Sequence, residues 1–203
     1  AASAKTAYHS ADGGGAWERT FRAPGDAVIT AVALDPLNVQ QAVITTSGGL
    51  YRTTDGGRHW GRVFGGAGLG ASACDSPLFH PTRAQTVFAG AATRLLQSED
   101  GGAHWESLSL PQGAGAIRAL ALHPASADQL YAMAEQELFE VSLRDRQWRS
   151  LFRLSTPQGE SPDDIEEAAE ELTEEILSSQ SLTSLAVDPQ DAQRLFLGSS
   201  RGV

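Results

Sequence analysis

The sequence predicts an all-β fold, a β-propeller built from four-stranded blades. A ten-residue motif occurs three times, as "YHSADGGGAW" at 8–17, "YRTTDGGRHW" at 51–60 and "LQSEDGGAHW" at 96–105. A second motif, an apolar run that ends in Pro, occurs four times with prolines 45, 43 and 65 residues apart. A period of 43 to 45 residues with four short strands per repeat is typical of a propeller blade.

Each repeat presents its predicted strands in the same order. The first is an inner run such as "AVAL" at 31–34, which is apolar on successive residues and therefore expected to be buried between neighbouring blades. A polar turn leads to the second apolar run, "AVIT" at 42–45. The third and fourth strands are "GLYRTT" at 49–54 and "HWGRVF" at 59–64. The same order returns after Pro81 and Pro124.

Sixteen strands are expected in all, about four blades' worth. Residues 6–21 supply strands three and four of one blade, three complete blades follow, and "LFLGSSRGV" at 195–203 follows strand one of another blade. These strands could close as a four-bladed ring or form an arc of a larger propeller. We favour the arc for residues 1–203, because four blades is the lower limit of the usual range and the last strand would otherwise leave an exposed edge.

Each copy of the ten-residue motif contains S/T-x-D-x-G-x-x-W, and we call it a box. The box falls on the turn between strands three and four, where Ser, Thr and Asp can bond backbone amides, Gly tolerates positive φ and Trp packs back. A structural role is therefore predicted for Ser10, Asp12, Gly14, Trp17, Thr53, Asp55, Gly57, Trp60, Ser98, Asp100, Gly102 and Trp105. An eroded fourth box, "VSLRDRQWRSL", keeps Trp148 but has lost the Asp and Gly positions.

These motifs resemble the Asp-box, or BNR, repeat family of β-propellers, over nearly the whole chain except residues 156–180. That family includes sialidases, xyloglucan-degrading glycoside hydrolases, sortilin-like receptor ectodomains and photosystem II assembly factors of the Ycf48/HCF136 type. The resemblance implies that the box lies on the periphery, away from the central face where substrates bind. It also implies an extracytoplasmic compartment, either periplasmic, lumenal or secreted.

Sialidase chemistry would require an arginine cluster, a tyrosine nucleophile with a carboxylate partner, and an acid. Arg118 and Tyr131 lie on predicted strands, but the sequence pairs no acidic residue with Tyr131. The "FRAP" segment at 21–24 is similar to a sialidase motif, yet it follows a box where that motif precedes the first one. The sequence therefore disfavours a sialidase.

A xyloglucanase-like enzyme would use two carboxylates across a cleft. Asp35 and Asp188 precede repeat prolines, but the two other repeats place His80 and His123 at this position. A position that alternates Asp with His before a turn proline indicates a turn-capping group rather than an acid/base pair. A glycoside hydrolase, with a carbohydrate partner, is thus kept as the alternative function.

Metal, cofactor and nucleic-acid functions receive no support. The five histidines contain no i,i+4 pair, and Cys74 is the single cysteine. No apolar run approaches the roughly 18 residues of a membrane helix. Of the 25 acidic residues, nine lie between Glu160 and Glu175, so the remainder has 16 acidic and 15 basic residues. The rest of the chain is therefore nearly neutral and offers no basic surface for the phosphate backbone of a nucleic acid.

The acidic residues belong to an insertion at 156–180, which is predicted to hold an amphipathic helix. In "SPDDIEEAAEELTEEILSS" at 161–179, Ser161 can cap the helix and Pro162 suits its first turn. In one interpretation, the apolar stripe of the helix docks on the propeller and the acidic side chains face water. In the other interpretation, the acidic face of the helix binds a basic surface on a partner protein. The residues of this face are Asp163, Asp164, Glu166, Glu167, Glu170, Glu171, Glu174 and Glu175.

From these residues we expect a non-catalytic propeller with no cofactor and no metal. Its expected function is that of a protein-protein interaction scaffold or an assembly factor for a larger complex.

Overall fold

The computed structural model describes residues 5–65, 74–154, 181–191 and 193–200. The described residues form sixteen strands and no helix. The strands are β1 (Thr6–His9), β2 (Glu18–Arg22), β3 (Ile29–Asp35), β4 (Asn38–Thr46), β5 (Gly49–Thr53), β6 (Gly61–Phe64), β7 (Cys74–Phe79), β8 (Val87–Ala91), β9 (Arg94–Ser98), β10 (Glu106–Ser109), β11 (Ile117–Leu122), β12 (Gln129–Ala134), β13 (Glu137–Ser142), β14 (Gln147–Arg153), β15 (Leu182–Val187) and β16 (Leu195–Ser199). The predicted number and order of strands are confirmed.

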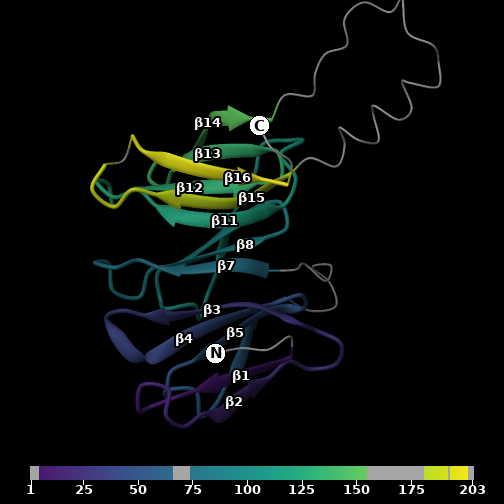
Figure 1. Ribbon diagram of the computed structural model, residues 1–203, viewed down its shortest axis with the longest axis vertical. Coiled ribbons are helices and arrows are strands. Elements are labelled where there is room, and N and C mark those ends of the chain that lie inside the picture. The colour runs from purple at the N-terminus through teal and green to yellow at the C-terminus, as the bar shows by residue number, and fades with distance from the viewer. Residues whose placement is uncertain (1–4, 66–73, 155–180, 192, 201–203) are drawn as a thin grey trace, which may run out of the picture.

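The strands form three antiparallel four-stranded sheets, β3–β6, β7–β10 and β11–β14, and two two-stranded sheets, β1–β2 and β15–β16. Within each sheet the strands follow one another in sequence order, as in a propeller blade. The first strands β3, β7, β11 and β15 contact one another in series. Figure 1 shows β1–β2 at the lower end of the stack and β15–β16 in its upper part beside β11 and β12, with β14 nearest the top. The described strands therefore form an open arc rather than a closed four-bladed ring.

The hydrophobic core is divided into layers between neighbouring sheets. Val43 on β4 packs toward the β7–β10 sheet, whereas the next residue, Ile44, packs toward β1–β2. Phe88 on β8 likewise lies in the layer shared with the β11–β14 sheet. Successive residues of a second strand thus face two different neighbours, which explains why these strands are apolar without alternation.

The expectation that the inner strands would be the buried ones was wrong, because β7 and β11 are mostly half-buried, β15 buries only Leu182, and β3 buries only Asp35. Its side chains alternate between exposed and half-buried until Asp35, whereas Val43 to Thr46 on β4 are fully buried. β3 is exposed because the sheet that precedes it contains only β1 and β2. These two strands are equivalent to the third and fourth strands of a blade, so no first or second strand covers β3. The predicted acidic helix at 161–179 lies outside the described residues.

Candidate functional site

The third box shows how these residues build the outer turn between β9 and β10. The Ser98 hydroxyl donates to Asp100 Oδ1 at 2.8 Å and accepts the Gly102 N–H at 2.8 Å. Asp100 Oδ1 also accepts the N–H groups of Ala103 and His104, each at 2.9 Å. Gly101 and Gly102 have φ of 71° and 91°, a region that glycine adopts without the strain a side chain would add. The side chains of Ser98 and Asp100 thus find their partners within the turn.

The tryptophan of the box closes the turn over its own glycine. Trp105 Nε1 donates to the Gly102 carbonyl at 3.0 Å, and Trp60 Nε1 donates to the Gly57 carbonyl at 3.2 Å. In the eroded box, the indole N–H of Trp148 is buried and has no hydrogen-bond partner among the described residues. Loss of the glycine turn therefore coincides with loss of the acceptor for this N–H.

The other two intact boxes repeat the hydroxyl hydrogen bonds of the third. Thr53 Oγ1 donates to Asp55 Oδ1 at 2.8 Å and accepts the Gly57 N–H at 3.0 Å. Ser10 Oγ donates to Asp12 Oδ1 at 2.7 Å and accepts the Gly14 N–H at 2.8 Å. The three copies differ in burial, since Ser10 is half-buried and the rest of its box is exposed, whereas Thr53 and Ser98 are buried.

Hydrogen bonds hold the box carboxylates in their charged form. Burial raises the pKa of Asp100, but bonds from the backbone and ring of His104 outweigh it and hold this pKa below its ordinary value. Bonds from the His59 backbone and ring lower the pKa of Asp55, and the Ala16 N–H lowers that of Asp12. A carboxylate bonded in this way is a poor proton donor near neutral pH.

Two boxes also hold neighbouring sheets together, a contact that sequence reasoning missed. The Arg52 Nε of β5 and the Gln41 Nε2 of β4 both donate to the carbonyl of Gly101, at 2.7 and 2.8 Å. Thr20 Oγ1 of β2 donates in the same way to the Gly57 carbonyl. No sequence signal marks Arg52 or Gln41, because their partners lie 49 and 60 residues away.

The residues before the repeat prolines cap turns. The Oδ1 atoms of Asp35 and Asp188 accept the N–H two residues on, at 2.8 and 2.9 Å. The Nδ1 atoms of His80 and His123 accept the equivalent N–H, each at 3.2 Å. Asp and His alternate at this position because both present an acceptor at the same place. Burial, aided by the charge of Arg83, lowers the pKa of His80 and favours the neutral, accepting ring.

Tyr131 is opposite an acidic residue, which the sequence did not indicate. The β12–β13 register places Glu140 beside Tyr131, and Arg149 pairs with Glu140 from β14. The tyrosine is only 3% exposed and stacks on His123 with ring centroids 5.5 Å apart. Burial, and then the charge of Glu140, raise the pKa of Tyr131, so the phenol stays protonated and is a weak nucleophile.

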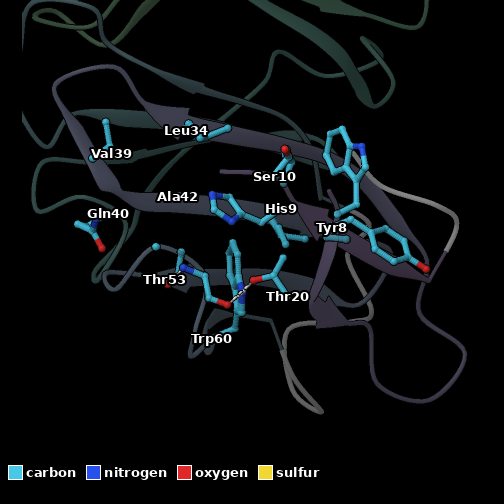
Figure 2. Close-up of a pocket in the computed structure, with 16 residues that line it drawn as sticks. Tyr8, His9, Ser10, Thr20, Leu34, Val39, Gln40, Ala42, Thr53 and Trp60 are labelled. Atoms are coloured by element: carbon cyan, nitrogen blue, oxygen red, sulfur yellow. Dashed lines mark hydrogen bonds between the residues drawn. The ribbon is translucent and has the colours of Figure 1, made fainter. Parts of the chain in front are cut away.

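An apolar cavity of about 240 Å³ lies between β1–β2 and the β3–β6 sheet, and we call it the end groove. Figure 2 shows Leu34 and Val39 on one side of it, and Thr20 with Trp60 on the other. Trp17, Leu34 and Val39 are exposed, whereas Ile44 at the base is buried. Trp60 Nε1 donates to Thr20 Oγ1 at 3.1 Å. The lining offers a ligand an aromatic and aliphatic contact surface with few polar groups.

Other expected features can be placed briefly. Cys74 is buried, and burial raises the pKa of its thiol to about 12. Arg118 forms an ion pair with Glu135. In the described ranges, no group of three His, Cys, Asp or Glu side chains could hold a metal ion. Nor does any helix there have the length and apolar character to cross a membrane. The eight acidic partner-binding candidates lie outside the described residues.

Comparison with known proteins identifies the fold. No protein-family profile and no curated protein matches this sequence. The GH74 xyloglucanase from Xanthomonas campestris matches with a TM-score of 0.62 and 19% identity, over 92% of this chain and 29% of that one. YCF48 bound to D1 peptide matches with a TM-score of 0.52 and 14% identity, over 86% and 69% of the two chains. The extracellular domain of a one-component system from B. thetaiotaomicron matches with 0.56 and 15%, over 88% and 20%.

At these identities the likeness shows the β-propeller fold alone. The chain spans 29% of the xyloglucanase, so it corresponds to a part of that enzyme's length. The matches include both an enzyme and a peptide-bound propeller, and the fold by itself does not separate these functions.

Proposed function

We propose that this chain is an Asp-box β-propeller unit that acts as a protein-protein interaction scaffold, as in an assembly factor, and not as an enzyme. The observation that carries the proposal is the end groove, where Trp17, Leu34 and Val39 remain exposed around an apolar cavity. Contiguous exposed apolar surface with an aromatic side chain is typical of protein docking sites. The peptide-bound YCF48 structure supports the same function for a propeller.

The described carboxylates support a non-catalytic function. Asp35 is buried and caps its turn, while Asp188 caps the equivalent turn and pairs with Arg194 at 3.2 Å. A glycosidase needs one carboxyl group that carries a proton and a second one across a cleft. The Asp residues of the boxes have lowered pKa values and bond their own turns. In this proposal the box residues are structural.

The alternative function is a glycoside hydrolase, which is favoured by the match to the GH74 xyloglucanase. We further propose that residues 1–203 belong to one propeller with an insertion at 156–180, whose acidic residues bind a basic partner surface. An extracytoplasmic location is proposed by resemblance, since one matching structure is an extracellular domain.

Turnover assays separate the two functions. We expect no hydrolysis of xyloglucan, β-glucan or a fluorogenic sialoside by the intact chain. Turnover that disappears in Asp35→Asn or Tyr131→Phe, while the melting temperature is unchanged, would establish the hydrolase instead.

Partner capture tests the scaffold directly. Extract from the source organism is passed over the immobilised chain, over Leu34→Glu and over Ser107→Glu, a control on the exposed face of β10. A partner that Leu34→Glu loses and Ser107→Glu retains supports docking at the end groove. Deletion of 161–178 tests the acidic segment, and binding through it should weaken steeply as salt rises.

A further inference from the structure

His80 lies at the junction between the β7–β10 and β11–β14 sheets, in the turn that joins β7 to β8. The residue is only 4% exposed. Its ring nitrogen Nδ1 accepts the backbone N–H of Thr82 at 3.2 Å and that of Arg83 at 3.0 Å. A nitrogen that accepts two N–H groups carries no proton, so these bonds assign the neutral ring with its proton on Nε2. The turn is therefore capped only while Nδ1 is unprotonated.

The other nitrogen of the ring links this turn to the neighbouring sheet. The Nε2–H is the donor that remains for the backbone of Ala127, whose hydrogen bond favours the protonated ring. Ala127 belongs to the turn that joins β11 to β12. Arg83 Nη2 binds Asp128 Oδ1 in that same turn at 2.6 Å. The two turns, residues 80–86 and 123–128, thus meet through a ring and an ion pair, and we call their meeting the turn contact.

The surroundings of the ring disfavour a positive charge on it. Burial is the largest cause that lowers the pKa of His80, and the charge of Arg83 lowers it further. The Ala127 backbone and the Asp128 carboxylate raise this pKa, but burial and Arg83 outweigh them. Among the described residues, the charged groups that act on the ring are thus Arg83 from its own turn and Asp128 from the opposite one. In an opened turn the ring faces water and has its ordinary pKa of 6.5, so the opened turn binds a proton more readily than the closed one.

Protonation of the ring also removes the hydrogen bonds that cap the turn. A protonated imidazole has two N–H donors and no acceptor. The new N–H at Nδ1 would face the N–H groups of Thr82 and Arg83, which lose their acceptor at the same moment. Three donors that point at one another repel, so a proton on Nδ1 is incompatible with the closed turn.

The chain contains a matched ring one sheet further on. His123 occupies the equivalent repeat position, and its Nδ1 accepts the Ala125 N–H at 3.2 Å. This ring is half-buried and stacks on Tyr131, with ring centroids 5.5 Å apart. The two histidines therefore make the same kind of cap, but His80 makes it in the more enclosed site.

We propose that the turn contact is a pH-sensitive switch, in which His80 joins the two sheets while its ring is neutral and releases them at this point when Nδ1 takes up a proton. The sheets stay joined elsewhere, because Phe88 and Ile117 pack in the core layer between them. The change is thus a local opening at one edge of the junction and not global unfolding. The inference goes beyond the scaffold function, since the switch needs no partner protein.

Hydrogen–deuterium exchange of the 203-residue chain at about pH 7.5 and about pH 5 tests the switch, with labelling times corrected for the pH dependence of chemical exchange. We expect the protection of amides 80–86 to fall by up to about 30-fold at the lower pH. This limit follows because about 1.5 pH units separate the ordinary pKa of 6.5 from pH 5, and each unit favours the opened turn at most about tenfold. The amides of β12 and β13 should keep their protection.

Two variants separate the switch from a general effect of acid. His80→Asn keeps an acceptor, the side-chain amide oxygen, but does not take up a proton in this range, so amides 80–86 should be equally protected at both pH values. His123→Asn changes the equivalent ring and should leave the parent response of amides 80–86 in place. A loss of less than about 3-fold in the parent, the parent response in His80→Asn, or an equal loss across β12 and β13 overturns the proposal.

NMR of the parent chain gives a second readout that does not depend on how a variant folds. At about pH 7.5 the His80 ring should be the Nε2–H tautomer, and its protonation midpoint should lie below 6.5. The carbonyl carbon of Ala127 should shift with the same midpoint as the ring, because the two lie together in the turn contact. An Nδ1–H tautomer near neutral pH, or an Ala127 shift that is independent of the ring, contradicts the inference.

Discussion

Replacing Ser98 with Ala should destabilise the protein far more than the same change at Ser10. Both hydroxyls donate to the box aspartate and accept a glycine N–H at 2.8 Å, so the hydrogen bonds are matched. The difference is burial, because Ser98 is 2% exposed and Gly102 is buried, whereas Gly14 is exposed. Water can therefore replace the Ser10 hydroxyl but not that of Ser98.

The expected magnitudes follow from this difference. Ser98→Ala leaves the buried Gly102 N–H without an acceptor, which costs about 1–3 kcal/mol, and it also removes a bond to the Asp100 carboxylate. We expect a total of about 2–3 kcal/mol for Ser98→Ala and no more than about 0.5 kcal/mol for Ser10→Ala.

Urea unfolding measures both free energies, and equal m-values would show that the unfolded states are comparable. Equal losses at the two boxes would refute the reasoning, since hydrogen-bond number and not burial would then control the cost. A loss below about 0.5 kcal/mol for Ser98→Ala would refute it as well.

Three further predictions concern stability at acid pH, stability near neutral pH and the packing of the hydrophobic core. The pKa of Asp100 is lowered in the folded state, so its carboxylate contributes stability above pH 3.8, its ordinary pKa, and this stability is lost as the pH falls through the folded-state pKa. Asp100→Asn should therefore make the free energy of unfolding depend less steeply on pH in the acid range. An unchanged pH dependence contradicts this. The pKa of His80 is also lowered, so the stability that its neutral ring contributes is complete above pH 6.5, its ordinary pKa, and declines as the pH falls below that value. His80→Asn should therefore reduce the pH dependence of the melting temperature between pH 5 and 7. Phe88→Ala should cost about 3–5 kcal/mol in urea unfolding because the ring is fully buried between two sheets, and a cost under about 1 kcal/mol would show that the junction collapses around the cavity.

The sequence by itself determined the blade pattern, because that pattern depends on local chemistry repeated at a constant period. A turn that needs two positive-φ residues, an acceptor for the amide of the second one and a tryptophan cover is recognisable in "TTDGGRHW" and "SEDGGAHW" without coordinates. The alternation of Asp35 with His80 was interpretable for the same reason, since a turn cap involves residues only two positions apart.

Only the tertiary structure decided which repeated positions are buried and which partners they meet. Leu34 and Phe79 are equivalent in sequence, but their exposure depends on whether a preceding pair of inner strands is present. Arg52 reaches the Gly101 carbonyl across 49 residues, and Tyr131 meets Glu140 through the register of two strands. Local patterns encode the turns and strands because their hydrogen bonds close within a few residues, whereas junctions and the end groove depend on contacts between sheets that the chain brings together only on folding.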